Sequence, residues 1–251
     1  MPHLQRGDAR LYYEDSGSGT PILLTHGFGA STGMWRGQVE AFQNRYRLIS
    51  WDMRGHGQTT CPEELSHFSQ ALTDDDMAAL LDHLEIDQAV IAGHSLGGFM
   101  SLSFNVAHPD RVKALVLQGC GPGYRRDEPR LAWNERAERR ARTLEEGGLP
   151  ALGGGAEVGE SMQGSANGLA LAARGILSQV DSRVMDSLKG ISVPTLVICG
   201  DGDKPYVDGA RYMGDRIPGA TYVEVPGAGH GVNVEKPDAV NAALEAFLVD
   251  L

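Results

Sequence analysis

Side chains that could carry out nucleophilic catalysis occur at three separate places in the chain. Ser95 lies within Gly93–Gly98 (GHSLGG), a Gly-x-Ser-x-Gly pattern; His230 lies between two glycines, and Asp201 and Asp203 precede it in the chain. A serine hydroxyl is a weak nucleophile at neutral pH, so it needs an imidazole to accept its proton and a carboxylate to orient that imidazole. If the fold brings the three groups together, they can attack an acyl carbon.

The residues around Ser95 predict a sharp turn from a strand into a helix. An apolar run at 89–92 precedes the serine, and apolar residues at helical spacing follow it. Side chains two positions before and after a serine in such a turn would collide with the chain, which explains the glycines at Gly93 and Gly97. The strand before and the helix after favour a nucleophile turn over a chance occurrence of the pattern.

A second loop could stabilise the negative charge that acyl transfer builds on a carbonyl oxygen. The apolar stretch 21–25 predicts a buried strand, which runs directly into 26–29 (HGFG). Glycines on both sides of Phe28 permit a tight loop that presents the Phe28 N–H, and the N–H of Leu96 is the second expected donor. We favour this interpretation over an ordinary glycine turn because Ser95 is present.

Strands and helices alternate along most of the chain, which predicts an α/β fold with a mostly parallel, twisted sheet and helices on both faces. The further elements expected are strands at 46–51, 112–117, 193–199 and 220–225, an edge strand at 10–14, a helix starting at 73–76 and an amphipathic helix at 240–248. The alternation breaks between about 121 and 189. Helical stretches at 130–146 and 169–188 flank a glycine-rich passage there, so this segment is expected to be an insertion.

The carboxyl ends of parallel strands form the sites of such sheets, so Ser95, one of the two aspartates and His230 should emerge on the same rim. Other polar clusters have structural interpretations. The residues at 52–57, with an exposed-looking His56, favour a charged turn. The aspartates at 74–76 favour capping of a helix over a metal site. The sequence has no HExxH motif or Cys/His cluster, so we expect no metal and no other cofactor.

Composition and charge restrict the molecules that could be partners of this protein and the compartment in which it is expected. The 251 residues carry a formal net charge of −11, which argues against nucleic acid as a partner. No apolar run is long enough to span a membrane, and the N-terminal residues lack the apolar core of a signal peptide, so a cytoplasmic protein is expected. The three widely spaced cysteines are expected to be reduced packing residues. A homo-oligomer is compatible with the sequence, which leaves the oligomeric state open.

Taken together, these motifs resemble those of α/β-hydrolase fold proteins, in the family's order of serine, acid and histidine. The resemblance covers nearly the whole chain outside the insertion. The roles it implies are nucleophile for Ser95, acid for Asp203, base for His230, and oxyanion hole for the amides of Phe28 and Leu96. The family's usual spacing of the acid after a glycine favours Asp203 over Asp201.

The resemblance also implies two structural units, a hydrolase core at 1–121 and 189–251 and a helical cap at 122–188 over the site. The cap residues expected to contact substrate are Trp133 and Met162, and the other apolar candidates for its pocket are Leu149, Leu152, Leu169 and Ile176. Seven arginines lie between Arg125 and Arg142. They could recognise a substrate carboxylate, as in the enol-lactonases that the chain also resembles. We favour a solvated helix, because glutamates precede Arg139 and Arg142 at i,i+4 spacing.

The predicted function is that of a serine hydrolase, a carboxylic ester hydrolase that cleaves small carboxylic esters or lactones through an acyl-enzyme. Two other enzyme activities remain open, a carbon–carbon bond hydrolase of ring-fission products and a cofactor-free perhydrolase. A non-catalytic ligand receptor on the same fold is the alternative from another class, and it would show at most slow, near single-turnover hydrolysis.

Overall fold

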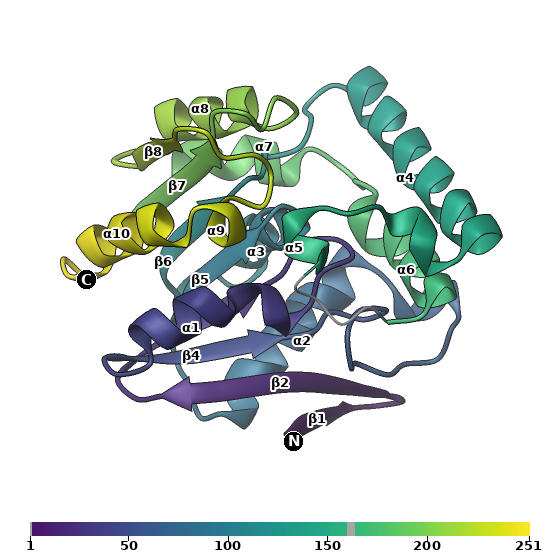
Figure 1. The fold of residues 1–251 in the computed structure, drawn as a ribbon, viewed down its shortest axis with the longest axis horizontal. Coiled ribbons are helices and arrows are strands. Elements are labelled where there is room, and N and C mark those ends of the chain that lie inside the picture. Colours follow the sequence, from purple (N-terminus) through teal and green to yellow (C-terminus); the bar gives the residue numbers. More distant parts are fainter. Residues whose placement is uncertain (1, 160–163) are drawn as a thin grey trace.

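The computed structural model describes residues 2–159 and 164–251, and a single eight-stranded sheet forms its centre (Figure 1). The strand order is β1-β2-β4-β3-β5-β6-β7-β8, with β1, β2 and β4 paired antiparallel and all other neighbours parallel. The strands are β1 (His3–Arg6), β2 (Ala9–Gly17), β3 (Thr20–Thr25), β4 (Tyr46–Trp51), β5 (Ala89–His94), β6 (Val112–Gln118), β7 (Thr195–Gly200) and β8 (Thr221–Val225). The α/β fold class predicted from the sequence is confirmed.

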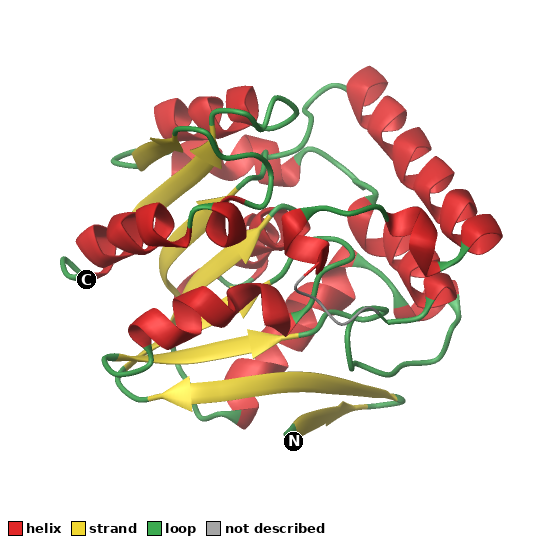
Figure 2. Cartoon of the chain, viewed as in Figure 1, coloured by secondary structure: helices red, strands yellow, loops and turns green. Residues whose placement is uncertain are grey.

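Helices cover both faces of the sheet (Figure 2). They are α1 (Arg36–Phe42), α2 (Gln70–His83), α3 (Leu96–Ala107), α4 (Asp127–Gly147), α5 (Ala156–Gly159), α6 (Ala166–Ala172), α7 (Arg183–Ser187), α8 (Val207–Arg216), α9 (Val232–Glu235) and α10 (Pro237–Leu248). Helices α2, α3 and α8 contribute to one apolar cluster, and α1 and α10 to another.

Alternation along the strands separates these two clusters. On β3, Leu23 belongs to the cluster under α2 and α3, whereas its neighbours Ile22 and Leu24 belong to the cluster under α1 and α10. Successive side chains of a strand point to opposite faces, so a fully apolar strand can fill two cores. The central strands β3 and β5 are therefore fixed from both sides, and their carboxyl ends provide a rigid edge for the site.

Two expectations for the N-terminal half were wrong. The segment at 10–14 is not the edge of the sheet, because β1 pairs with β2 and covers its outer side. Helix α2 begins at Gln70 rather than at Thr73, since the Ser69 hydroxyl accepts the Leu72 N–H and caps the helix. The aspartates assigned to capping lie inside α2 instead, where Asp76 forms a buried ion pair with Arg54 at 2.6 Å.

Between β6 and β7 the described residues form helices and no strand. Helix α4, on the right of Figure 1, packs on α6 and on the turn that follows it. A small apolar cluster of this segment includes Leu144, Leu152, Val158 and Leu169. The expected single helix at 169–188 is wrong: α6 ends in a π-helical turn at Ala173–Leu177, and α7 begins only at Arg183.

Among the described residues, no helix is long and apolar enough to cross a membrane. The cysteines Cys61, Cys120 and Cys199 are free thiols, as expected, and the last two are buried. Cys120 packs beside Gly98, where a β-carbon would lie 2.5 Å from its sulfur. Glycine at position 98 therefore allows α3 to approach the segment after β6.

Candidate active site

Ser95 lies in the turn between β5 and α3, in a conformation with φ 53° and ψ −114° that non-glycine residues rarely adopt. Its backbone N–H donates to the Gln118 carbonyl of β6 at 2.8 Å, which ties the turn to the neighbouring strand. A β-carbon at Gly93 would lie 2.1 Å from the Gly97 carbonyl oxygen, and one at Gly97 would lie 2.1 Å from the Thr25 oxygen. Both glycines are therefore required by close backbone contacts.

A continuous hydrogen-bonded chain runs from Ser95 to a carboxylate. His230 Nδ1 lies 2.8 Å from Oδ2 of Asp203, and His230 Nε2 lies 2.9 Å from Oγ of Ser95. An ionised carboxylate can only accept, so Nδ1–H donates to Asp203 and Nε2 is left to accept the Ser95 proton. The rival acid Asp201 instead accepts the Gly227 N–H at 2.8 Å on the surface. Of the two aspartates, Asp203 is the one joined to His230.

The loops after β7 and β8 position these two side chains. Asp203 accepts the amides of Tyr206 and Val207 through its carbonyl, so the acid immediately precedes the first turn of α8. The loop that carries His230 is fixed by Glu235, which accepts the N–H groups of Gly229 and Gly231. The backbone hydrogen bonds of the two loops therefore hold Asp203 and His230 in place at the ends of β7 and β8.

The amides of Phe28 and Leu96 donate to no group in the described part of the chain. Leu96 N–H is the first amide of α3, where the helix dipole favours negative charge. Gly27 lies against Ser95, because a β-carbon there would be 3.3 Å from Cβ of Ser95. The Phe28 loop and the start of α3 thus border the Ser95 side chain on two sides.

The imidazole of His230 is in contact with two other rings. Tyr206 stacks on it with ring centroids 4.8 Å apart and an interplanar angle of 19°, and His94 lies at a centroid distance of 4.8 Å. Burial raises the pKa of Tyr206 to about 12, while its hydroxyl interacts with Ser95, which lowers it. Sequence reasoning missed Tyr206. Its position three residues after Asp203, at the end of a strand, was the available signal.

Two further histidines support loops and stay neutral. His94 donates through Nε2 to the His230 carbonyl at 2.7 Å, and burial lowers the pKa of His94 to about 3. His26 accepts the Met53 N–H and donates to the Gly27 carbonyl, and burial holds its pKa well below the usual range. Both histidines therefore form hydrogen bonds within the loops that border Ser95.

His56 is fully buried, which corrects its exposed appearance in the sequence. Its Nδ1 donates to the Arg54 carbonyl at 3.0 Å, and its ring packs edge-on against Phe28 at a centroid distance of 5.5 Å. Burial lowers the pKa of His56 to about 4. The same turn is held by Asp52, which accepts the amides of Thr32 and Gln58. His56 therefore supports the Phe28 loop as an uncharged packing group.

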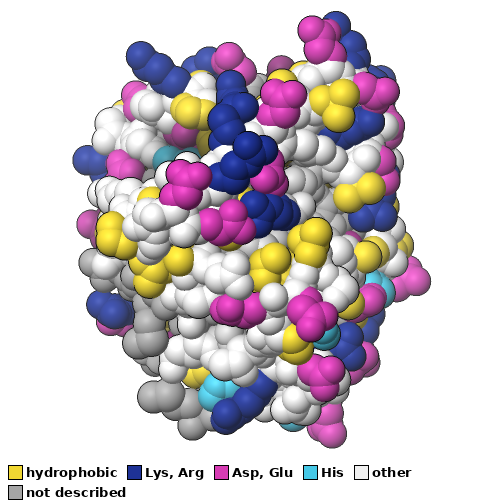
Figure 3. All heavy atoms as spheres, turned by 90° about the vertical axis from the view of Figure 1, so that its right-hand side faces the viewer, with side chains coloured by type: hydrophobic (Ala, Val, Ile, Leu, Met, Phe, Trp, Pro, Cys, Tyr) yellow, Lys and Arg dark blue, Asp and Glu magenta, His cyan; other side chains and the backbone are white. Residues whose placement is uncertain are grey.

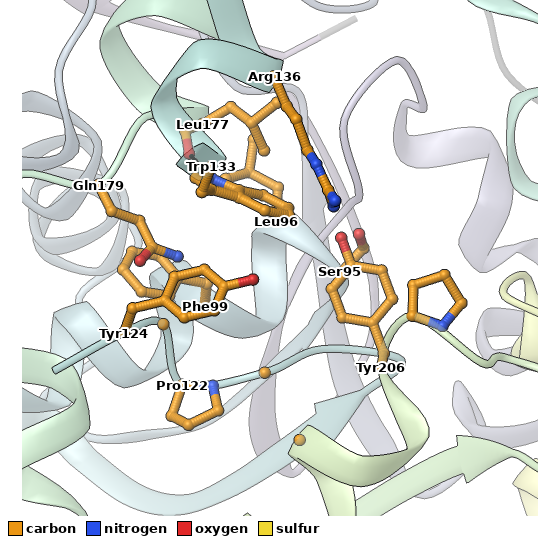
Figure 4. A pocket seen from close by; sticks show the side chains of 14 residues that line it. Ser95, Leu96, Phe99, Pro122, Tyr124, Trp133, Arg136, Leu177, Gln179 and Tyr206 are labelled. Carbon is orange, nitrogen blue, oxygen red and sulfur yellow. Dashed lines mark hydrogen bonds between the residues drawn. The ribbon is translucent and has the colours of Figure 1, made fainter. Parts of the chain in front are cut away.

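Two cavities meet at Ser95, and the smaller of them is seen in Figure 4. One has a volume of about 250 Å³ and is bordered by Phe99, Pro122 and Tyr124, and the other has a volume of about 560 Å³ and is bordered by Phe28, Asp203 and His230. The residues common to both are Ser95, Trp133, Arg136, Leu177, Pro205 and Tyr206. An opening on each side of the serine fits a molecule whose two parts extend in different directions from the reacting carbon.

Trp133, predicted to contact substrate, lines both cavities, and Leu152 lines the larger one. Met162 lies outside the described residues. The remaining candidates do not reach either cavity: Leu169 and Ile176 are fully buried in packing clusters, and Leu149 is exposed. The helical segment must cover its own apolar side, and Leu169 and Ile176 serve that purpose.

The arginines of α4 fall into two groups. Arg139 and Arg142 pair with Glu135 and Glu138 one turn earlier, as the spacing predicts, and on the face seen in Figure 3 basic side chains stand next to acidic ones. Arg136 instead points toward Ser95 (Figure 4), and no hydrogen bond or ion pair is found for it in the described part of the chain. Sequence spacing could not separate Arg136 from its neighbours.

The family model for the alpha/beta hydrolase fold matches residues 20–148. This chain belongs to the α/β-hydrolase fold family. The 3-oxoadipate enol-lactonase 2 of Acinetobacter baylyi is 30% identical over 247 residues, which cover 90% of this chain and 88% of that protein. A thermophilic esterase from Thermogutta terrifontis superposes with a TM-score of 0.86 at 27% identity, covering 96% of this chain and 94% of the other.

A hydrolase from Pseudomonas aeruginosa is another structural neighbour of this α/β-hydrolase, with a TM-score of 0.83, 27% identity and coverage of 98% and 97% of the two chains. Within residues 2–159 and 164–251, no group of three or more His, Cys, Asp or Glu side chains could hold a metal ion.

Proposed function

We propose that this α/β-hydrolase cleaves small carboxylic esters or lactones, with Ser95 as nucleophile, His230 as general base and acid, and Asp203 as the orienting acid. The observation that carries the proposal is the unbroken hydrogen-bonded chain from Ser95 Oγ through His230 to Asp203, at the junction of two cavities. Such a chain converts a hydroxyl into a nucleophile at neutral pH.

In the first half of the reaction, His230 Nε2 takes the Ser95 proton while Oγ attacks the carbonyl carbon. The amides of Phe28 and Leu96, which have no other partner in the described part of the chain, would stabilise the resulting oxyanion. His230 then donates its proton to the alcohol oxygen, the bond from that oxygen to carbon breaks, and the acyl group remains on Ser95. Asp203 stabilises the imidazolium throughout.

In the second half, His230 accepts a proton from water as the water oxygen attacks the acyl carbon. The bond to Ser95 Oγ breaks, the proton returns to Oγ, and the carboxylic acid leaves. For a lactone, the alcohol and the acid remain in one molecule. The similarity to an enol-lactonase and to an esterase supports a carboxylic ester or lactone as the bond that is cleaved.

We further propose that residues 122–188 act as a cap on a core formed by 1–121 and 189–251. Support comes from Trp133 and Arg136 of α4 and Leu177 of the following turn, which border both cavities above Ser95. Within its described residues this segment has an apolar cluster of its own. Its side chains would therefore select the substrate, while the core supplies the reacting groups.

The test is hydrolysis of 4-nitrophenyl butanoate and of small lactones by the wild type and by Ser95→Ala. We expect turnover in the wild type, loss of at least about 1,000-fold in the variant, and covalent labelling of Ser95 by a fluorophosphonate. Full activity in Ser95→Ala, or labelling elsewhere, would contradict the proposal. Peracid formation from acetate and peroxide, or cleavage of a ring-fission product without ester turnover, would favour the perhydrolase or carbon–carbon alternatives.

A further inference from the structure

The two cavities differ in their relation to His230. During cleavage the leaving oxygen must receive the proton from His230 Nε2, so the alcohol part of an ester lies on the histidine side of Ser95. His230 and Asp203 line the larger cavity, and neither lines the smaller one. The smaller cavity, of about 250 Å³, therefore receives the acyl group. This assignment rests on the proposed function.

The acyl cavity contains a buried amide, that of Gln179. Its walls include Phe99, Pro122 and Trp133, and Gln179 lies across the cavity from Arg136 in Figure 4. Gln179 is only 8% exposed, and its Oε1 has no hydrogen-bond partner in the described structure. The indole N–H of Trp133 is already used by the Leu177 carbonyl, so it does not serve the amide.

The surroundings hold Gln179 in this place. The side chain of Asn134 on α4 accepts the Gln179 backbone N–H at 2.8 Å and donates to the Gln179 carbonyl at 2.9 Å. In the loop between β6 and α4, Gly123 has φ +83°, and a β-carbon there would lie 2.8 Å from Oε1 of Gln179. The two hydrogen bonds to the Gln179 backbone and the space left by Gly123 therefore hold the Gln179 amide in a defined position in the cavity wall.

Burial of an amide without a hydrogen-bond partner costs free energy, and a hydrocarbon chain bound beside the amide would not supply the missing partner. We propose that Gln179 is a specificity-determining residue and that the acyl cavity is built for an oxygenated acyl group. Its chain would carry a ketone oxygen that accepts from the Gln179 Nε2–H, for which no hydrogen bond is found in the described residues, or a hydroxyl that donates to Gln179 Oε1. A site built to make such a bond rejects the analogue that lacks it.

The experiment compares 4-nitrophenyl 4-oxopentanoate and 5-oxohexanoate with the pentanoate and hexanoate esters, using the wild type and Gln179→Met. Methionine keeps the length of the side chain and removes both polar atoms. We expect the wild type to prefer at least one oxo ester by about 10- to 100-fold in kcat/KM, and the variant to lose that preference, measured as the ratio of kcat/KM for each oxo ester to that for its plain ester. Arg139→Gln, on the outer face of α4, is the matched control.

Two outcomes would overturn the inference alone: equal turnover of oxo and plain esters by the wild type, or an unchanged preference in Gln179→Met. Absence of turnover with every ester would instead overturn the proposed function. A measurement on the wild type does not depend on folding of the variant. Free 4-oxopentanoate or 5-oxohexanoate should inhibit ester hydrolysis at about tenfold lower concentration than the plain acid of the same length, and equal inhibition by both acid pairs would contradict the inference.

Discussion

Replacement of Asp203 by asparagine isolates the contribution of one proton position. Asp203 is 3% exposed and its Oδ2 faces His230 Nδ1 at 2.8 Å, so an asparagine fits the same space. If the asparagine amide donates to Nδ1, the imidazole proton moves to Nε2. His230 then presents a donor to Ser95 Oγ, at 2.9 Å, where catalysis needs an acceptor.

The expected loss follows from that change of tautomer. In a serine protease triad the same substitution leaves the geometry intact and lowers kcat by about 10,000-fold, which corresponds to about 5 kcal/mol of transition-state free energy. Asp203→Asn should therefore lose kcat with little change in KM. Its thermal unfolding should stay close to that of the wild type, because the side chain keeps its size and its hydrogen bond to His230 Nδ1.

The assay is steady-state hydrolysis of 4-nitrophenyl butanoate, with unfolding followed by circular dichroism. Asp201→Asn is the matched control, since Asp201 lies two residues away and accepts only the Gly227 N–H. It should retain activity within about twofold, as expected of an exposed substitution. Retention of more than a tenth of wild-type kcat by Asp203→Asn, or an equal loss in both variants, would refute the assignment of the acid.

Three further predictions concern stability and selectivity. Asp76→Asn should destabilise the fold by about 3–5 kcal/mol in urea titrations, because it leaves the buried Arg54 charge uncompensated. Asp74 is buried beside Ser103, and burial raises its pKa to about 7, so its ionisation opposes folding and its own contribution to stability should decline as the pH rises from 4 to 7. Asp74→Asn should remove a few kcal/mol of that decline in unfolding experiments, and parallel curves would contradict it. Arg136→Gln should lower kcat/KM about tenfold for a carboxylate-bearing lactone and leave a neutral lactone unchanged; equal effects on both would refute a role in anion recognition.

Local patterns predicted most of the core correctly, because the residues of a strand or a turn interact mainly with their neighbours in the chain. The apolar run before Ser95 and the glycines around it specify β5, the turn and α3 without reference to distant residues. The start of α2 was missed for the opposite reason. Asp74 and Asp76 match the composition of a first helical turn, but Ser103 and Arg54, distant in the sequence, hold them inside the helix.

The sequence by itself determined the type of chemistry. Ser95, His230 and the aspartates each follow a strand, and strands that alternate with helices must deliver their carboxyl ends to one edge of the sheet. Only the tertiary structure decided which groups meet there. Asp203 rather than Asp201 is bonded to His230, and Tyr206 stacks on the His230 ring. Arg136 and Gln179 line a cavity, whereas Arg139 forms an ion pair on the surface. The reason is that the direction of a side chain on a loop or helix depends on its packing against distant segments, and the residues next to it in the sequence do not determine that packing.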